Sequence, residues 1–255
     1  MLREIMTTKL TIVLMSLLSF FGCGKSAAPQ YPCDTLVARD GSPIKITFFA
    51  HASLAIEWQG RHIYLDPVGE AVPWSKLPKA DVVLITHEHY DHFDMAAIEA
   101  VQSPETRILL DKSSAEGFQG DCYTMLPGAV AEPFADIRVE AVAAYNTSEH
   151  QLQFHPKDRE DCGYVVTLGG DVRIYISGDT EPTPEQAAIK GVDIAFICVN
   201  QPYTMTPEQA VAAVKALQPK IYYPYHYGQV DEPTDVEALA RMLDGVAEVR
   251  IRPLA

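Results

Sequence analysis

The chain has 255 residues and a formal net charge of −14, from 20 Lys and Arg against 34 Asp and Glu. Hydrophobic residues make up 47% and charged residues 21%, which is close to a globular average and excludes a disordered, collagen-like or coiled-coil protein. An acidic chain is a poor binder of polyanions, so we expect no nucleic-acid partner. Five cysteines are too few for a disulfide scaffold.

Residues 1–22 have the pattern of a signal peptide. Arg3 and Lys9 make the start positive, and residues 10–21 form an apolar run that is too short to span a membrane. Cys23 follows Gly22 directly after this run, which resembles the lipobox of bacterial lipoproteins. The resemblance implies cleavage before Cys23, lipidation of that cysteine, and export to the bacterial cell envelope, with the protein lipid-anchored at the periplasmic or outer face. Ordinary secretion and an uncleaved anchor are the alternatives.

The stretch from residue 23 to residue 42 is polar and contains two prolines, so it is interpreted as the lipidated Cys23 followed by a tether. Cys198 lies in an apolar run and is expected to be a buried free thiol. Cys122 and Cys162 lie near turn residues and are the first pair to test for a disulfide.

Residues 43–255 are predicted to form one α/β domain. Short apolar or alternating runs predict strands, and amphipathic runs with capping residues predict helices. In chain order these are strands at 44–49, 53–58, 61–65 and 82–86, a helix at 95–101, strands at 107–111, 137–142, 164–168 and 172–177, a helix at 184–190, a strand at 192–199, a helix at 206–217, a strand at 221–224, a helix at 235–243 and a strand at 248–251. This order predicts two sheets with helices outside them.

A histidine-rich motif follows the strand predicted at 82–86. The chain reads His87-Glu88-His89-Tyr90-Asp91-His92. Because residues i and i+2 of an extended segment point the same way, His87 and His89 can meet one metal ion. Asp91 and His92 can address a second position once the chain turns. Imidazole and carboxylate groups together suit Zn²⁺, and also Mn²⁺ or Fe²⁺, so the motif predicts a metal site.

This strand and motif resemble the metallo-β-lactamase superfamily, and the later motifs of that superfamily occur in order across about residues 44–228. The resemblance implies a four-layer αββα sandwich that binds two divalent metals, zinc foremost, at one edge. Asp66 matches a strand-end aspartate that supports the site. Asp179 matches the aspartate that bridges the two metals, and His226 matches the last histidine ligand.

One ligand departs from the pattern of the superfamily. A third histidine for the first metal is usual at a strand end, where this chain has only Ala143-Ala144-Tyr145-Asn146. His155 is favoured for this role, because its two neighbours can anchor and stiffen the loop. His150, Asn146 and water are the alternatives.

Two further residues are candidates for contact with a substrate. The segment around His51 resembles the branch of the superfamily that contains ascorbate-6-phosphate lactonase and the phospholipase D that cleaves N-acyl phosphatidylethanolamine. That resemblance implies that His51 lies near the metals and faces the substrate or supports a ligand. Tyr203 follows a predicted strand and could form a wall of the pocket, although packing is the commoner fate of such a tyrosine.

The resemblance implies a metal-dependent hydrolase that acts on a small molecule. A bound divalent cation lowers the pKa of water toward about 7, and the resulting hydroxide would cleave an ester, lactone, amide or phosphodiester bond. Asp91 would orient this nucleophile or move its proton, and Asp66 would hold a ligand by a hydrogen bond. A β-lactamase-type hydrolase and a metal-binding lipoprotein without turnover are the alternatives. The expected partners are the substrate and, through Cys23, a membrane, and the oligomeric state stays open.

Overall fold

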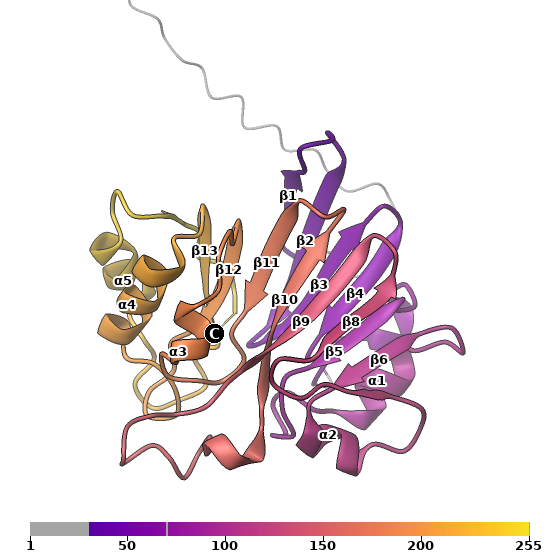
Figure 1. The fold of residues 1–255 in the computed structure, drawn as a ribbon, viewed down its shortest axis with the longest axis horizontal. Coiled ribbons are helices and arrows are strands. Elements are labelled where there is room, and N and C mark those ends of the chain that lie inside the picture. Colours follow the sequence, from indigo (N-terminus) through magenta and orange to yellow (C-terminus); the bar gives the residue numbers. More distant parts are fainter. Residues whose placement is uncertain (1–30, 70, 255) are drawn as a thin grey trace, which may run out of the picture. The chain divides into compact units, whose positions relative to one another are not determined.

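The computed structural model describes residues 31–69 and 71–254, which form two seven-stranded sheets (Figure 1). The first sheet has the order β1 (Cys33–Val37), β2 (Pro43–Ala50), β3 (Ser53–Trp58), β4 (Arg61–Leu65), β5 (Val82–Ile85), β6 (Arg107–Leu110) and β7 (Tyr123–Thr124). The second has the order β14 (Glu248–Val249), β13 (Ile221–Tyr225), β12 (Ile194–Cys198), β11 (Val172–Ile176), β10 (Cys162–Leu168), β9 (Ile137–Ala143) and β8 (Val130–Phe134). Cys23 and the predicted signal peptide at 1–22 lie outside the described residues.

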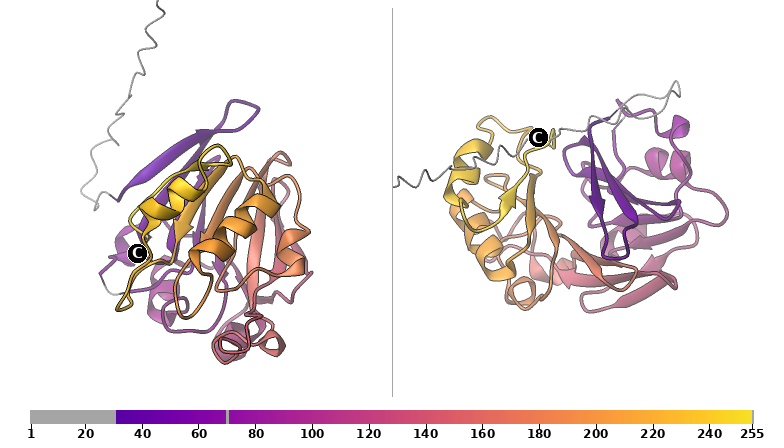
Figure 2. Two further views of the ribbon diagram at one scale, coloured as in Figure 1. Left: turned by 90° about the vertical axis from the view of Figure 1, so that its left-hand side faces the viewer. Right: turned by 90° about the horizontal axis from the view of Figure 1, so that it is seen from above.

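Helices cover the outer face of each sheet, as the views in Figure 2 show. The elements α1 (Met95–Val101) and α2 (Lys112–Gly117) lie outside the first sheet, and η1 (Trp74–Lys76) packs against α1. The helices α3 (Pro184–Ala187), α4 (Pro207–Leu217) and α5 (Val236–Met242) lie outside the second sheet. The predicted αββα sandwich is therefore confirmed. Among the described residues, no helix combines the length and apolar character needed to cross a bilayer.

The main core lies between the two sheets, because alternate residues of their strands point inward. Phe196 of β12 stacks on Tyr223 of β13 with ring centroids 4.8 Å apart, and Phe48 of β2 packs on Tyr223 from the other sheet. A second apolar cluster joins α1 to the outer face of the first sheet. Both faces of the first sheet are therefore packed, and its interior strand β5 is wholly buried.

The N-terminal part of the domain differs from the prediction. Residues 33–37 belong to β1, which pairs antiparallel with β2, so the folded domain begins before the predicted boundary at residue 43 and this part of the predicted tether is a strand. Asp34 in β1 accepts hydrogen bonds from the Tyr223 hydroxyl at 2.6 Å and from the Arg252 guanidinium at 2.8 Å. These contacts fasten β1 to the second sheet and to the C-terminal residues.

The structure also contains α2, β7, β8 and a single turn of 3₁₀ helix, η2 (Lys157–Arg159), which the sequence analysis did not predict. The expected pairing of Cys122 with Cys162 is wrong, because both residues carry free thiols. The thiol of Cys162 is buried and donates to the carbonyl of Met125 at 3.2 Å. Cys198 is a buried free thiol, as predicted.

Candidate metal centre

The candidate site lies where strand ends of both sheets meet. Strands β4 and β5 run parallel, and so do β11, β12 and β13, so the carboxyl ends within each set share one edge. The residues that follow these ends are Asp66, His87, Asp179, Asn200 and His226. The backbone takes positive φ at His51, Asp66 and His226 (53°, 42° and 50°), a conformation that costs energy for a residue with a side chain. The fold thus holds these turns in a strained form at the site.

Three histidines form the first cluster of possible ligands, namely His87, His89 and His155. The Nε2 atom of His87 lies 3.0 Å from Nδ1 of His89. The ring of His155 packs edge-on against both, with centroids 5.1 Å and 4.9 Å away. His87 and His155 are buried, and one atom of each of the three rings falls within 4.8 Å of the others. The cluster has the size and the nitrogen donors of a divalent metal site.

The second cluster consists of Asp91, His92 and His226, with His51 beside them. The Oδ2 atom of Asp91 lies 3.4 Å from Nε2 of His226 and 3.1 Å from Nε2 of His51. The ring of His92 stacks on that of His226 with centroids 5.0 Å apart. His51 therefore lies in contact with a possible ligand carboxylate, as the sequence analysis expected of a residue near the metals.

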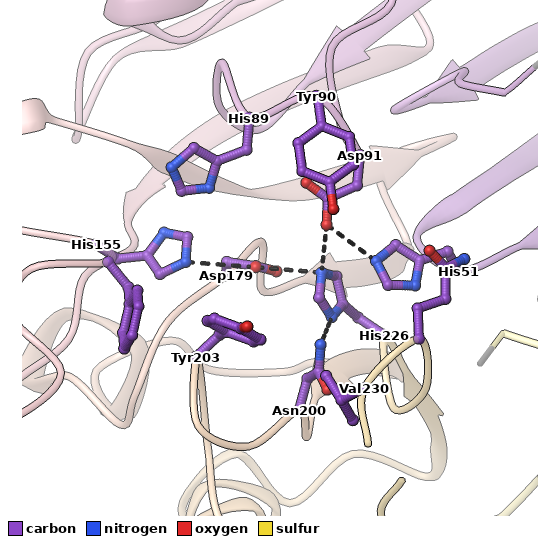
Figure 3. Close-up of a pocket in the computed structure, with 12 residues that line it drawn as sticks. His51, His89, Tyr90, Asp91, His155, Asp179, Asn200, Tyr203, His226 and Val230 are labelled. Carbon is purple, nitrogen blue, oxygen red and sulfur yellow. Dashed lines mark hydrogen bonds and ion pairs between the residues drawn. The ribbon is translucent and has the colours of Figure 1, made fainter. Parts of the chain in front are cut away.

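Asp179 lies between the two clusters (Figure 3). Its Oδ2 atom is 3.5 Å from Nε2 of His155 and 3.2 Å from Nε2 of His226. Its Oδ1 atom is 3.5 Å from Nε2 of His92. One carboxylate thus faces ligand atoms of both clusters, which is the position that a bridging ligand requires.

Buried hydrogen bonds orient the rings of the second cluster. Asp66 accepts a hydrogen bond from His92 Nδ1 at 2.8 Å, and Thr86 donates to the same carboxylate from its backbone and its hydroxyl. The side-chain amide of Asn200 lies 2.9 Å from Nδ1 of His226. The atom of this amide that faces the ring is the nitrogen Nδ2, so Asn200 holds the ring of His226 as a hydrogen-bond donor. In both histidines Nε2 is then left to face Asp179.

An arginine and a carboxylate brace the first cluster from behind. Arg159 donates to Asp161 through Nε at 2.8 Å and through Nη2 at 2.5 Å. Its guanidinium also lies 2.7 Å from Nε2 of His89 and 3.0 Å from Nδ1 of His155. Because Arg159 touches both rings and is itself fixed by the buried Asp161, the loop after β9 is tied to the motif after β5.

The charges of the two clusters differ in the protein without metal. Burial lowers the pKa of His87 well below its ordinary value, and burial with the charge of Arg159 lowers the pKa of His89 to about 4. Burial also acts to lower the pKa of His92, but the Asp179 and Asp66 carboxylates raise it to about 9. His87 and His89 are therefore neutral and ready to bind a cation, whereas a cation at the second cluster must displace a proton from His92.

The donor set fits a divalent metal. His92 Nε2, His226 Nε2 and Asp179 Oδ1 are buried, and none has a hydrogen-bond partner among the described residues. Burying such atoms unpaired is costly, and these three converge on one place. Imidazole nitrogens and a carboxylate in this number match the ligands of zinc and of similar transition metals.

Comparison with known proteins agrees with this geometry. A family model described as the β-lactamase superfamily domain matches residues 45–226. The chain belongs to the metallo-β-lactamase superfamily. A UPF0173 metal-dependent hydrolase from Koribacter versatilis is 31% identical over 221 residues, which is 79% of this chain and 93% of that protein. The chain is thus a metal-dependent hydrolase of the UPF0173 family.

Solved structures support the same assignment. A crystal structure of a metal-dependent hydrolase from Parabacteroides distasonis is 40% identical, covers 89% of this chain and all of the other, and has a TM-score of 0.83. A metallo hydrolase from the archaeon Ignicoccus hospitalis is 24% identical, covers 83% of this chain and 96% of its own, and has a TM-score of 0.66. The second likeness shows the shared fold alone.

The structure separates the three candidates for the missing ligand of this metal-dependent hydrolase. His155 lies in the first cluster. His150 is exposed and lies in neither cluster. The amide nitrogen of Asn146 donates to the carbonyls of Gln151 and Tyr203, at 3.1 Å and 2.7 Å. Asn146 therefore fastens loops together near the site, and His155 is the candidate that the geometry supports.

Several site residues were missed by the sequence analysis. Asn200 directly follows the end of β12, so the rule that site residues sit at strand ends could have found it. Arg159 and Asp161 give no such signal, because their roles depend on a loop that folds back across 70 residues to His89. Tyr203 was predicted as a pocket wall, and it does line the pocket that opens beside Asp91 and Asp179.

Proposed function

We propose that this protein binds two divalent cations, zinc foremost, and uses them to hydrolyse an ester, lactone, amide or phosphodiester bond of a small molecule. The observation that carries the proposal is the pair of ligand clusters with the Asp179 carboxylate between them. When bound, such cations supply a water of lowered pKa and polarise the substrate oxygen. Manganese and iron fit the same donors and are the alternatives to zinc.

Asp91 has the position of a catalytic group. Its carboxylate lines the pocket and is partly accessible, with 21% of the side chain exposed. Burial acts to raise the pKa of Asp91, but the close contacts with His226 and His51 outweigh it and keep that pKa below the ordinary value, so Asp91 is ionised at neutral pH. It can therefore accept a proton from the attacking water, and His51, at 3.1 Å, can hold that proton next.

The pocket favours turnover over storage of metal. A cavity of about 270 Å³ opens directly on His155, Asp179 and His226, so a substrate can reach the ligand atoms. Sites that only hold a metal for structure are closed by protein ligands, whereas catalytic ones keep an open position. The resemblance of the segment around His51 to the lactonase and phospholipase D branch supports a substrate of that kind over a β-lactam.

Metal analysis combined with a substrate screen tests the proposal. The purified protein should hold two equivalents of metal and hydrolyse at least one member of a panel of esters, lactones, amides, phosphodiesters and β-lactams. Asp91→Asn should lower kcat at least a hundredfold. Glu88→Gln is the matched control, since Glu88 is exposed in the same motif and lies in neither cluster. Two bound metals with no hydrolysis of any substrate would instead favour a metal-binding protein without turnover.

We also propose that the protein is exported and anchored by a lipid on Cys23. What supports this is the apolar run at residues 10–21 followed by Gly22 and Cys23. Metabolic labelling with a radioactive fatty acid, followed by membrane fractionation, tests it. Label that disappears in Cys23→Ser, together with release from the membrane fraction, is the expected result. Equal labelling of both proteins would contradict it.

A further inference from the structure

Three aromatic side chains surround the mouth of the metal-site pocket, and we call Tyr90, Phe154 and Tyr203 the aromatic rim. Tyr90 is 88% exposed and Tyr203 is 39% exposed. Figure 3 shows Tyr90 and Tyr203 on opposite sides of the line that joins His155, Asp179 and His226. Exposed aromatic rings on both sides of an opening offer apolar contact to whatever enters it.

Two residues of the aromatic rim, Phe154 and Tyr203, are held in place before any ligand binds. The rings of Phe154 and Tyr203 meet edge to face, with centroids 4.9 Å apart. Asn146 fixes both loops, because its amide donates to the carbonyls of Gln151 and Tyr203, and its backbone donates to the carbonyl of His155. A ligand that packs on this pair therefore has little ordering of the protein to overcome.

The pocket has no cation of its own to attract an anionic substituent. Among the described residues that line it, none is lysine or arginine, while Asp91 and Asp179 contribute carboxylates. The two nearest cations in the loop after β9 are engaged elsewhere. Arg159 is bound to Asp161, and Lys157 is bound to Tyr145 and Glu185. A negative charge on the distal part of a substrate would thus find no partner at the rim.

We propose that the aromatic rim selects substrates that carry an uncharged aromatic or bulky apolar group beside the bond to be cleaved, and that it rejects those with a second anionic group there. Phe154 and Tyr203 are the residues that determine this specificity. The inference rests on the proposed hydrolysis at the metal site and names the class of molecule on which that site acts. A phosphorylated or carboxylated distal group is accordingly disfavoured.

Matched esters test the proposal with the metal-loaded protein. Benzyl acetate and methyl phenylacetate are isomers with the ring on opposite sides of the ester, and ethyl acetate and methyl propanoate are their counterparts with a methyl group in place of the ring. The ratio of kcat/KM for each aryl ester to that of its counterpart is the readout, because intrinsic reactivity cancels when variants are compared. We expect this ratio, for at least one isomer, to fall roughly tenfold in Phe154→Ala and in Tyr203→Ala. The acetate ester of 4-(hydroxymethyl)benzoate should react more slowly than benzyl acetate.

Three controls distinguish a change in substrate specificity from a general loss of folding or metal binding. Tyr123→Ala removes an exposed tyrosine on β7 that does not line the pocket, so the ratio should not change. Phe154→Leu keeps an apolar side chain next to His155, so the ratio of kcat/KM values should fall less in this variant than in Phe154→Ala. Bound metal must stay at the wild-type level in every variant used. An unchanged ratio for both isomers in Phe154→Ala and Tyr203→Ala, or equal cleavage of the carboxylated ester, would overturn the proposal.

A binding measurement distinguishes failure of this proposal from failure of hydrolysis itself. Saturation-transfer NMR with benzyl alcohol as the probe reports contact with the rim without any reaction. If no member of the panel of esters, lactones, amides and phosphodiesters is cleaved but the benzyl alcohol signal depends on Phe154 and Tyr203, the rim binds as proposed and the hydrolase function is wrong. If neither cleavage nor binding depends on these residues, the rim has no such role.

Discussion

The Oδ2 atom of Asp66 lies 2.8 Å from the Nδ1 atom of His92, and both side chains are buried. The two oxygens of Asp66 also accept from the backbone and hydroxyl of Thr86, so this carboxylate cannot turn freely. Because the oxygens of Asp66 accept these hydrogen bonds, His92 carries a proton on Nδ1. The proton that a cation must displace from His92 is therefore the one on Nε2, the atom that faces Asp179.

Replacing Asp66 by asparagine should weaken metal binding at the second cluster. An amide group turned toward His92 donates instead of accepting, so the ring would take the tautomer with its proton on Nε2. We expect the affinity for zinc to fall roughly 10- to 100-fold, as is usual when the partner of a ligand histidine is removed. Competition with a chromogenic chelator measures it. Asp94→Asn is the control, because Asp94 caps α1 and asparagine caps equally well. An unchanged affinity would show that Asp66 does not set the tautomer.

Replacing His155 should reduce the amount of bound metal, whereas replacing His150 should not. His155 is buried in the first cluster with His87 and His89, whereas His150 is exposed outside both clusters. We expect His155→Ala to bind about one metal ion fewer and His150→Ala to match the wild type. Elemental analysis after gel filtration gives the stoichiometry, and circular dichroism checks the fold. Loss of metal in His150→Ala alone would assign the missing ligand to the other histidine.

Glu181 should stabilise the fold in a manner that depends on pH. Burial acts to raise the pKa of Glu181, but hydrogen bonds from Ser148, Gln209 and Thr147 lower it to about 2. The folded state therefore favours the ionised form, so this stabilisation is complete above the unfolded pKa of 4.5 and is lost as the pH falls toward 2.

We expect Glu181→Gln to lower the free energy of unfolding by about 2 kcal/mol at pH 7. Denaturant titrations at pH 7 and pH 3 measure the difference, which should shrink at the lower pH. Glu149→Gln, at an exposed position in the same loop, should have little effect at either pH. A difference that does not depend on pH would mean that the charge of Glu181 contributes nothing.

Two glycines give a matched test of close packing behind the site. Gly178 and Gly170 both have positive φ, 62° and 76°. A Cβ atom on Gly178 would lie 3.0 Å from the carbonyl oxygen of Cys162, whereas one on Gly170 meets nothing within 4 Å. Both alanine variants should lose about 1 kcal/mol from backbone strain, and Gly178→Ala should lose about 1–2 kcal/mol more. It should also hold less metal, because Asp179 is the next residue. Equal stabilities from thermal unfolding would contradict this account.

Local patterns made much of the site predictable. His87, Asp179 and His226 each follow a short apolar strand, so the sequence itself indicates that they gather at one edge of a sheet. The part that could not be predicted depends on tertiary contacts. Arg159 reaches His89 across 70 residues, and nothing in the local sequence around either residue indicates it.

The N-terminal strand β1 could not be predicted from local sequence patterns either. Residues 33–37 lie in a stretch that is polar overall and follow a proline, which is typical of a tether, yet they pair along β2. This strand is held by Asp34, whose partners Tyr223 and Arg252 lie about two hundred residues away in the sequence.

The hydrogen bonds of Asp34 also determine how the domain opens. An edge strand ordinarily frays by itself, because only one neighbour holds it. Here β1 cannot separate from β2 unless the hydrogen bonds from Tyr223 and Arg252 to Asp34 break. Tyr223 belongs to the second sheet and Arg252 to the C-terminal segment. Native-state hydrogen exchange should therefore report one shared opening for the amides of β1 and of residues 250–252, with a common free energy and a common response to denaturant.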